Sequence, residues 1–374
     1  MSAGADQITY EVRNAKPPGE TLKENLDFLG ISQADLARRT GLSIKHINQI
    51  ALGAAVLTPE TAILLERVLD VPADVWNALE ASWRTQEQRR QDAAALQERL
   101  SWLDNFSLRE LVARRIIPNR AKTVDNLRLL LEFLEVGTPE AAENVWGSYK
   151  VAFRRSTTKV PDDYATAVWL QLALRSAREI KCDPYSRGKL IALIPKIRAL
   201  TLTEPAHWLA ELPRICAQAG VAVVFEPAMP RTFLSGATRW LATDKVMLAL
   251  SDRFKKIDQF WFAFFHEVGH IVLHGKRLTF LDENPAAQSG VSAEEEEANR
   301  FAADTLIPPA YAEQYRRLSE HPKPFRNIEA FAKFAQIAPG IVVGRLQYEG
   351  RLQWSEGHRM LTSVDFTSHK TSDE

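Results

Sequence analysis

Apolar residues recur every three or four positions through most of the first 83 residues, which is the spacing of one buried helix face. The pattern predicts a bundle of short helices, over residues 20–28, 32–40, 43–52, 59–69 and 73–83. Glycine or proline stands at each join, at Gly30, Gly41, Gly53 and Pro72. A charged, polar run over residues 84–100 then predicts an exposed linker helix, so the first domain should end near residue 90.

The pattern changes twice along the remaining chain. Helical spacing continues over residues 92–219 without a catalytic motif, which predicts a helical connector or platform. Short β-branched or alternating segments then predict the strands of a small sheet, over residues 221–225, 233–240 and 245–250. Long helices return over residues 257–274 and 292–306, followed by shorter helices to about Leu346. We therefore expect a mainly α, α+β protein whose sheet lies in the C-terminal domain.

These changes divide the 374 residues into four parts. We expect a helical domain over residues 1–90, a connector over 91–219, a sheet-containing domain over 220–350 and a tail over 351–374. Compact domains usually hold roughly 100 to 200 residues, so a chain of this length fits two or three of them. The polar end, residues 367–374, is predicted to be disordered.

Composition narrows the class of protein. Hydrophobic residues make up 45% of the chain and charged residues 25%, which is typical of a globular protein with a real core. The net charge is zero, so any binding to nucleic acid must be local. The first residues lack a basic and apolar leader, and no apolar run reaches the ~20 residues that span a bilayer. We expect a cytoplasmic protein without membrane contact, in which Cys182 and Cys216 are buried small hydrophobes.

The sharpest chemical signal is an HExxH motif inside the apolar helix over residues 257–274. His266 and His270 stand four residues apart, so both imidazoles leave the same helix face and can hold one cation. Glu267 lies beside the first histidine and is placed to act as general base on an attacking water. Burying these three polar groups in such an apolar helix would be costly without partners. The motif predicts a catalytic zinc site.

A catalytic zinc takes three protein ligands, so one more must come from elsewhere. His274 lies eight residues after His266, or roughly 12 Å along a straight helix, which is too far to share the ion. We assign His274 a structural or supporting place. The strand over residues 245–250 could be a sheet edge that receives an extended substrate peptide, or equally an internal strand.

The better source of a third ligand is the glutamate run that opens the helix over residues 292–306. If its small and apolar residues are buried, Glu294 and Glu295 point inward, Glu296 points outward and Glu297 lies on the flank. We favour Glu295 as the ligand and keep Glu294 and Glu297 as alternatives. Asn299, one turn further on, would orient a ligating histidine. The competing interpretation is a capping box of Ser292 with Glu295.

The HEVGH segment followed by EEEEANRFAADTLIPP resembles the ImmA/IrrE family of metallopeptidases, over roughly residues 220–310. Its motif of HExxH, then ExxAN, FAA and a Leu-x-Pro ending matches here except at Thr305-Leu306-Ile307-Pro308, a departure that affects packing more than chemistry. The resemblance implies a zincin-like fold that binds Zn²⁺ and cleaves DNA-bound repressors.

Residues 31–53 have the spacing of a helix-turn-helix, with a tight turn at Gly41 and a second helix capped by Ser43. Lys45, Asn48 and Gln49 would reach base edges, while Gln33 and Ser43 would contact phosphates. Over residues 17–83 the chain resembles the Xre-type domain of HigA antitoxins, which implies operator binding and a homodimer. Residues 1–90 hold 10 Lys and Arg against 12 Asp and Glu, a weak balance for a duplex binder. A protein-docking or dimerisation module is the alternative.

Three functions compete on these grounds. The first is a zinc endopeptidase coupled to transcriptional regulation, whose protein substrate is a DNA-bound repressor. The second is a DNA-binding repressor or antitoxin whose metal domain senses a signal without proteolysis. The third is a stress regulator whose peptidase acts on its own chain. Loss of Glu267 separates the first from the second, because only a peptidase needs its general base.

Overall fold

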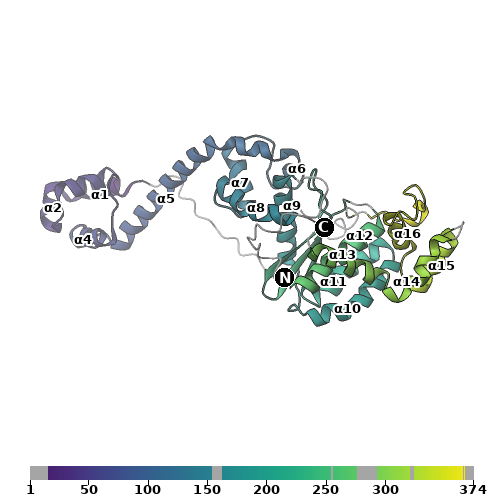
Figure 1. The fold of residues 1–374 in the computed structure, drawn as a ribbon. Coiled ribbons are helices and arrows are strands. Elements are labelled where there is room, and N and C mark those ends of the chain that lie inside the picture. The colour runs from purple at the N-terminus through teal and green to yellow at the C-terminus, as the bar shows by residue number, and fades with distance from the viewer. Residues whose placement is uncertain are drawn as a thin grey trace. The chain divides into compact units, whose positions relative to one another are not determined.

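The computed structural model describes residues 16–153, 162–253, 256–275, 293–320, 324–364 and 366 (Figure 1). The chain forms two compact units, one ending at Ser101 and the other beginning at Trp102. The predicted fold class is confirmed, because the structure is mainly helical with a small sheet in the C-terminal part. The finer division of the chain at residues 219 and 350 stays a prediction.

The first unit is a helical bundle. Its helices are α1 (Pro18–Leu29), α2 (Gln33–Thr40), α3 (Ile44–Ala51), α4 (Pro59–Leu69) and α5 (Ala73–Glu98). Leu22, Leu36, Ile47 and Trp76 from four of them are at most 1% exposed and share one core. Gly19 lets α1 approach α3 closely, because a Cβ there would lie 2.4 Å from the Ala51 carbonyl oxygen.

Helix α5 extends to Glu98 and so includes most of the segment predicted to be a separate linker helix. Residues 84–98 contain no glycine or proline, so nothing interrupts the helix that begins at Ala73. Arg84 lies inside it and donates to the carbonyls of Gly53 and Ala55, at 3.3 and 2.9 Å. The start of the expected linker therefore belongs to the packed bundle.

The second unit holds a sheet of strands β1 (Val221–Phe225), β2 (Gly236–Ala242) and β3 (Lys245–Leu250). Among the described residues the strand order is β1-β3-β2, with β1 parallel and β2 antiparallel to β3. The interpretation of residues 245–250 as a sheet edge is therefore wrong. Strand β3 pairs with β1 on one side and with β2 on the other, so among the described residues β1 and β2 are the edges.

Helices supply the remainder of the second unit (Figure 1). They are α6 (Leu108–Ala113), α7 (Val124–Leu134), α8 (Pro139–Phe153), α9 (Asp163–Glu179), α10 (Arg187–Ala199), α11 (Pro205–Ala217), α12 (Ile257–Gly269), α13 (Ala293–Leu306), α14 (Ala312–Arg316), α15 (Pro324–Ala335) and α16 (Pro339–Tyr348). Trp208 of α11 and Trp261 of α12 are fully buried in one core with the strands. None of the described helices is long and apolar enough to cross a membrane.

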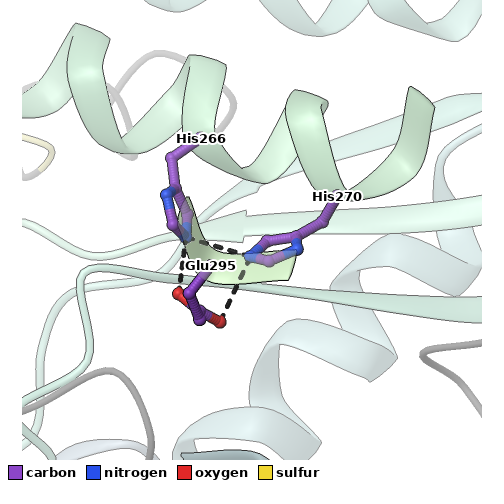
Figure 2. A group of neighbouring side chains, drawn as sticks. All are labelled: His266, His270 and Glu295. Carbon is purple, nitrogen blue, oxygen red and sulfur yellow. Dashed lines mark hydrogen bonds and ion pairs between the residues drawn. The ribbon is translucent and has the colours of Figure 1, made fainter. Parts of the chain in front are cut away.

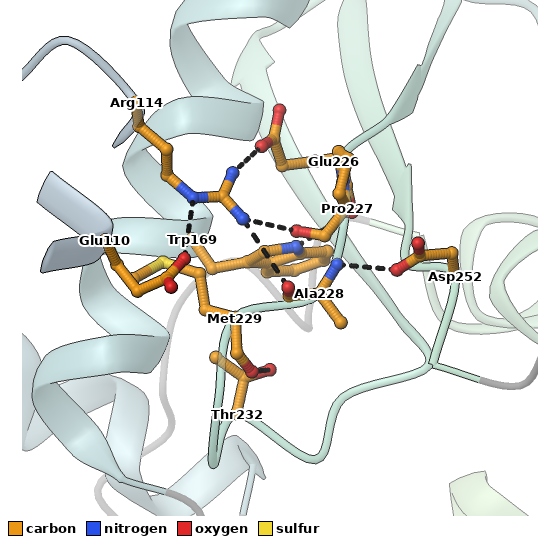
Figure 3. A network of polar contacts seen from close by, with 9 residues as sticks. All are labelled: Glu110, Arg114, Trp169, Glu226, Pro227, Ala228, Met229, Thr232 and Asp252. Carbon is orange, nitrogen blue, oxygen red and sulfur yellow. Dashed lines mark hydrogen bonds and ion pairs between the residues drawn. The ribbon is translucent and has the colours of Figure 1, made fainter. Parts of the chain in front are cut away.

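A buried polar network ties the loop after β1 to the helices before it (Figure 3). Arg114, at the end of α6, pairs with the carboxylate of Glu226 and donates to the Pro227 carbonyl at 3.0 Å. Trp169 of α9 donates from its indole nitrogen to the Glu226 carbonyl, also at 3.0 Å. Asp252 accepts the Ala228 amide at 2.7 Å. These contacts therefore hold the first residues of the connection between β1 and β2 in place.

Candidate metal centre

Helix α12 carries the HExxH motif and forms because its apolar residues meet partners on several sides. Ile257, Phe260, Trp261, Phe264, Phe265 and Val268 are all at most 4% exposed. The α-helix ends at Gly269, and residues His270–His274 form a π-helical turn, a feature that often marks functional sites. The predicted helix over residues 257–274 is therefore present, but its last turn is wider than expected.

Neighbouring side chains satisfy the carbonyls of this π-helical turn. Arg187 donates to the Val272 carbonyl at 2.8 Å, and the Tyr185 hydroxyl lies 3.4 Å from the Ile271 carbonyl. The indole of Trp240 on β2 donates to the Gly275 carbonyl at 3.1 Å. Buried or half-buried carbonyls need such partners, so these contacts hold the turn in one shape.

Two imidazoles and one carboxylate meet below this helix (Figure 2). The Nε2 atoms of His266 and His270 are 3.0 Å apart. Each lies 3.4 Å from a different carboxylate oxygen of Glu295. The exposed fractions of the three side chains are 15%, 9% and 17%. Their ligand atoms all lie within 4.8 Å of one another, so the three residues could hold one metal ion.

Helix α13 brings Glu295 to this position through close packing against α12. A Cβ at Gly269 would lie 3.1 Å from the Cα of Ala298, and Ala298 is itself fully buried. The contact needs a residue without a side chain on one helix and a small one on the other. Glu295 lies nearly one turn before Ala298 and therefore faces the two histidines.

The outer nitrogens of the histidines have polar partners too. Nδ1 of His266 lies 2.9 Å from the Asn299 oxygen, and Nδ1 of His270 lies 3.1 Å from Nδ1 of His274. An amide oxygen can only accept, so His266 carries its proton on Nδ1 and leaves a lone pair on Nε2. If His270 likewise donates to His274, two lone pairs face each other across 3.0 Å. A cation between them removes the repulsion.

The separations fit zinc. Zinc bonds of roughly 2.0–2.1 Å in a tetrahedron place neighbouring ligand atoms about 3.3 Å apart. The observed 3.0 and 3.4 Å separations bracket that value. Burial would raise the pKa of the Glu295 carboxyl, but the two imidazoles hold it well below its usual range. Burial lowers the pKa of His266, and Glu295 with Glu267 outweighs it, so the net shift is upward.

Glu267 is placed beside the trio and shielded from water. It is 9% exposed, and burial raises the pKa of its carboxyl although His266 and His270 oppose the shift. The Thr238 hydroxyl on β2 bonds this carboxylate. Gly236 opens the same strand, and a Cβ there would lie 2.9 Å from Cγ of Glu267. Strand β2 therefore packs against the side chain of Glu267.

The glutamate run on α13 differs in part from the sequence-based expectation. Glu294 is exposed, so the prediction that it points inward is wrong. The helix begins at Ala293, so Glu294 lies in its first turn. The helix dipole stabilises an acidic side chain there even when that side chain makes no contact with the protein interior. Glu297 contacts His274, whose Nε2 is 3.1 Å from its carboxylate. Ser292, the other half of the expected capping box, lies outside the described residues.

Sequence reasoning missed the contributions of β2 and of Glu297. Gly236 and Thr238 reach Glu267 from a strand that precedes it by about 30 residues, and no spacing rule connects them. The Gly-x-Thr pair inside the strand predicted over residues 233–240, shortly before HExxH, was the available signal. The sequence suggests Glu297 only as a metal ligand, whereas in the structure its carboxylate contacts Nε2 of His274.

The helix-turn-helix in the first unit consists of α2 and α3. Ser32 and Ser43 cap these helices, each accepting a backbone N–H at 3.1 Å, from Asp35 and His46. Gly41 adopts a φ of 76° between the helices, a left-handed conformation that glycine accepts readily. The predicted contact residues Ser43, Lys45, Asn48 and Gln49 are exposed, and Gln33 is half-buried. Ile47 and Ile50 of α3 are buried.

Comparison with known proteins agrees with this division of the chain. Residues 22–76 match the family model described as helix-turn-helix, and residues 216–336 match the IrrE N-terminal-like domain. The uncharacterized HTH-type transcriptional regulator YddM of Escherichia coli (strain K12) is 30% identical over 80 residues. That stretch covers 21% of this chain and 85% of the bacterial regulator. The second match contains all three residues of the candidate metal centre.

Proposed function

This chain belongs to the proteins that join an Xre-type helix-turn-helix DNA-binding domain to an IrrE N-terminal-like metallopeptidase domain, and we propose that it is a zinc endopeptidase that regulates transcription. One observation carries the proposal. A buried carboxylate, Glu267, lies directly beside a His-His-Glu trio whose three ligand atoms converge. A metal sensor needs the trio, but only hydrolysis needs the adjacent base.

The roles follow from the donor set and from burial. His266, His270 and Glu295 hold the metal, and Asn299 orients His266 by accepting its Nδ1 proton. A bound zinc ion supplies a Lewis acid that polarises the scissile carbonyl and makes water more acidic. Glu267 accepts a proton from the attacking water and delivers it to the leaving amine.

The substrate strand has a natural place beside β2. Among the described residues β2 pairs with β3 alone, and Gly236 and Thr238 of β2 contact Glu267. An extended peptide that adds to this edge would carry its backbone carbonyls past Glu267. The proposed substrate edge is therefore β2 and not β3, which the sequence leaves open as either an edge or an internal strand.

The first unit supplies DNA binding and suggests the class of substrate. Lys45, Asn48 and Gln49 on α3 are exposed and would contact bases, with Gln33 and Ser43 at phosphates. A domain that brings the chain to an operator raises the local concentration of proteins bound there. We propose a DNA-bound repressor as the substrate, and a homodimer as the operator-binding form.

A substrate trap tests the proposal. The Glu267→Gln variant is expressed in the native host, and proteins that co-purify with it are identified by mass spectrometry. We expect the variant to keep zinc, as measured by metal analysis, and to cleave the captured protein at least ~100-fold more slowly than the parent. His266→Ala should lose the metal. If Glu267→Gln relieves repression as well as the parent does, the peptidase function is excluded and a non-proteolytic metal sensor remains.

A further inference from the structure

A chain of polar contacts runs from the metal centre to the surface of α13. Nδ1 of His270 meets Nδ1 of His274 at 3.1 Å, and Nε2 of His274 meets the Glu297 carboxylate at 3.1 Å. We propose that His274 and Glu297 are positioning residues that hold His270 in the tautomer and orientation that bind zinc. This inference rests on the proposed zinc site but does not depend on proteolysis.

Proton accounting fixes the direction of every bond in the chain. A histidine that binds zinc through Nε2 must carry its proton on Nδ1. Nδ1 of His270 therefore donates to Nδ1 of His274, which must accept through its lone pair. The proton of His274 then lies on Nε2 and is donated to Glu297. One arrangement of protons satisfies all partners, with both imidazoles neutral.

The two histidine ligands are thus held differently. His266 donates to the amide oxygen of Asn299, a neutral side chain on α13. His270 donates to a second imidazole, whose other nitrogen faces a carboxylate. A carboxylate behind an imidazole favours the Nε2–H tautomer and strengthens the lone pair that receives the His270 proton. His270 is therefore the better electron donor of the two.

The surroundings show that orientation, rather than stability, is what Glu297 provides. The side chain of His274 is 8% exposed, whereas that of Glu297 is 58% exposed. An exposed carboxylate contributes little to folding, so its removal should barely change the free energy of unfolding. His274 is carried on the π-helical turn whose carbonyls Arg187, Tyr185 and Trp240 satisfy. The His274 imidazole is therefore held by the backbone turn that carries it and by the Glu297 carboxylate that lies at its Nε2.

Matched variants separate positioning from packing. His274→Gln keeps an acceptor for His270, while His274→Leu fills the space without one. Glu297→Gln keeps an acceptor for His274, and Glu297→Ala removes it. Glu296→Ala is the control, because it removes an exposed glutamate from the same turn of α13. Zinc affinity of the full chain is measured by competition with a chromogenic chelator, and the visible spectrum of the Co²⁺-substituted protein reports ligand geometry.

We expect His274→Leu to weaken zinc binding by about 10- to 100-fold and to change the Co²⁺ spectrum. His274→Gln and Glu297→Gln should stay within about threefold of the parent, and Glu297→Ala should fall between the two groups. Circular dichroism of the metal-free proteins verifies their folding. Because Glu297 is exposed, its variants keep the test valid even if His274→Leu misfolds.

Two results would overturn the inference. One is parental zinc affinity in Glu297→Ala, and also in His274→Leu where that variant folds, which would leave the proposed zinc peptidase intact. The other is a parent that binds no zinc at all, which removes the zinc site itself. Weakened zinc binding in these variants, combined with a Glu267→Gln variant that relieves repression as well as the parent does, would instead uphold the inference and exclude proteolysis.

Discussion

At the scale of single residues, the absence of a side chain at Gly236 sets the room available to Glu267. A Cβ at this position would lie 2.9 Å from Cγ and 3.1 Å from Oε1 of Glu267, and 3.1 Å from the Ala249 carbonyl oxygen. The carbonyl belongs to the central strand and cannot move away, so the carboxylate must yield. Its place beside the metal centre therefore depends on this glycine.

Gly236→Ala should consequently reduce cleavage of the trapped substrate by about 10- to 100-fold, because a displacement of about 1 Å at a general base costs that much. Zinc affinity should remain parental, since the three ligands are untouched. Cleavage rates and chelator competition on the same preparations measure both. Ala237→Gly, at the next position of β2, is the control. Parental activity in Gly236→Ala would show that the Glu267 carboxylate is not held against β2.

Glu349 illustrates a residue-scale contribution to stability that depends on pH. It accepts hydrogen bonds from Tyr315 and Arg345 at 2.9 and 3.0 Å, and Arg351 lies 3.2 Å away. Burial raises the pKa of its carboxyl, but these partners outweigh it and hold the pKa below the usual 4.5. Because the folded pKa is depressed, the stabilisation is complete above the unfolded value and is lost as pH falls through the folded one.

Glu349→Gln should therefore lower the free energy of unfolding by about 1 kcal/mol at pH 7, a value reduced by partial exposure of the site. The difference from the parent should shrink as the pH falls below about 4.5. Thermal unfolding at pH 7 and pH 4 tests this, with Glu329→Gln on the exposed face of α15 as control. A difference that grows in acid would contradict the assignment.

At the scale of elements, local sequence signals predicted where helices begin and end better than they predicted how the elements pack. Helix α4 begins and ends where expected, because Thr58 caps it, Pro59 opens it and Asp70 ends it in a left-handed conformation. Strand order was not predictable, since β1 pairs with β3 although residues 226–244 separate the two strands along the chain. A strand's alternation reveals its faces but not its neighbours.

The same limit applies to the candidate metal centre. The spacing of His266 and His270 on one helix is local, and it predicted their convergence correctly. The position of Glu295 depends on the close contact of Gly269 with Ala298, which only the packed pair of helices determines. The His274–Glu297 contact also joins two elements and depends on a π-helical turn. No hydrophobic periodicity in the sequence predicts that turn.

The buried ion pair of Arg114 and Glu226 links the end of α6 to the loop after β1. Their side chains are 15% and 3% exposed, so removing Arg114 takes an opposite charge away from a buried carboxylate. Arg114→Met should therefore lower the stability of the second unit by about 3–5 kcal/mol. Adding Glu226→Leu should restore part of the loss, although the Pro227 carbonyl stays without its donor.

Urea unfolding followed by circular dichroism measures these differences. Arg109→Met, an exposed arginine on α6, is the control for loss of positive charge. If Arg114→Met is no less stable than this control, the network in Figure 3 does not anchor the loop. A double variant less stable than Arg114→Met would show that Glu226 has other partners worth more than the ion pair.

At the scale of the whole molecule, the two units have separate cores and separate chemistry. The core of the first contains Leu36 and Trp76, and that of the second contains Trp208 and Trp261. The helix-turn-helix and the His-His-Glu trio thus depend on different sets of buried contacts. A ligand of one unit stabilises that unit by mass action and leaves the other unchanged unless the two are coupled.

Calorimetry of the full chain should accordingly show two unfolding transitions. Zinc at about 100 times its dissociation constant should stabilise the second unit by about 2.7 kcal/mol, and a chelator should reverse this shift. Leu36→Ala removes a fully buried side chain from the first unit and should lower the other transition by about 2–5 kcal/mol. If the chelator and Leu36→Ala move the same transition, metal binding and the helix-turn-helix are energetically coupled, and the regulator works as a single cooperative body.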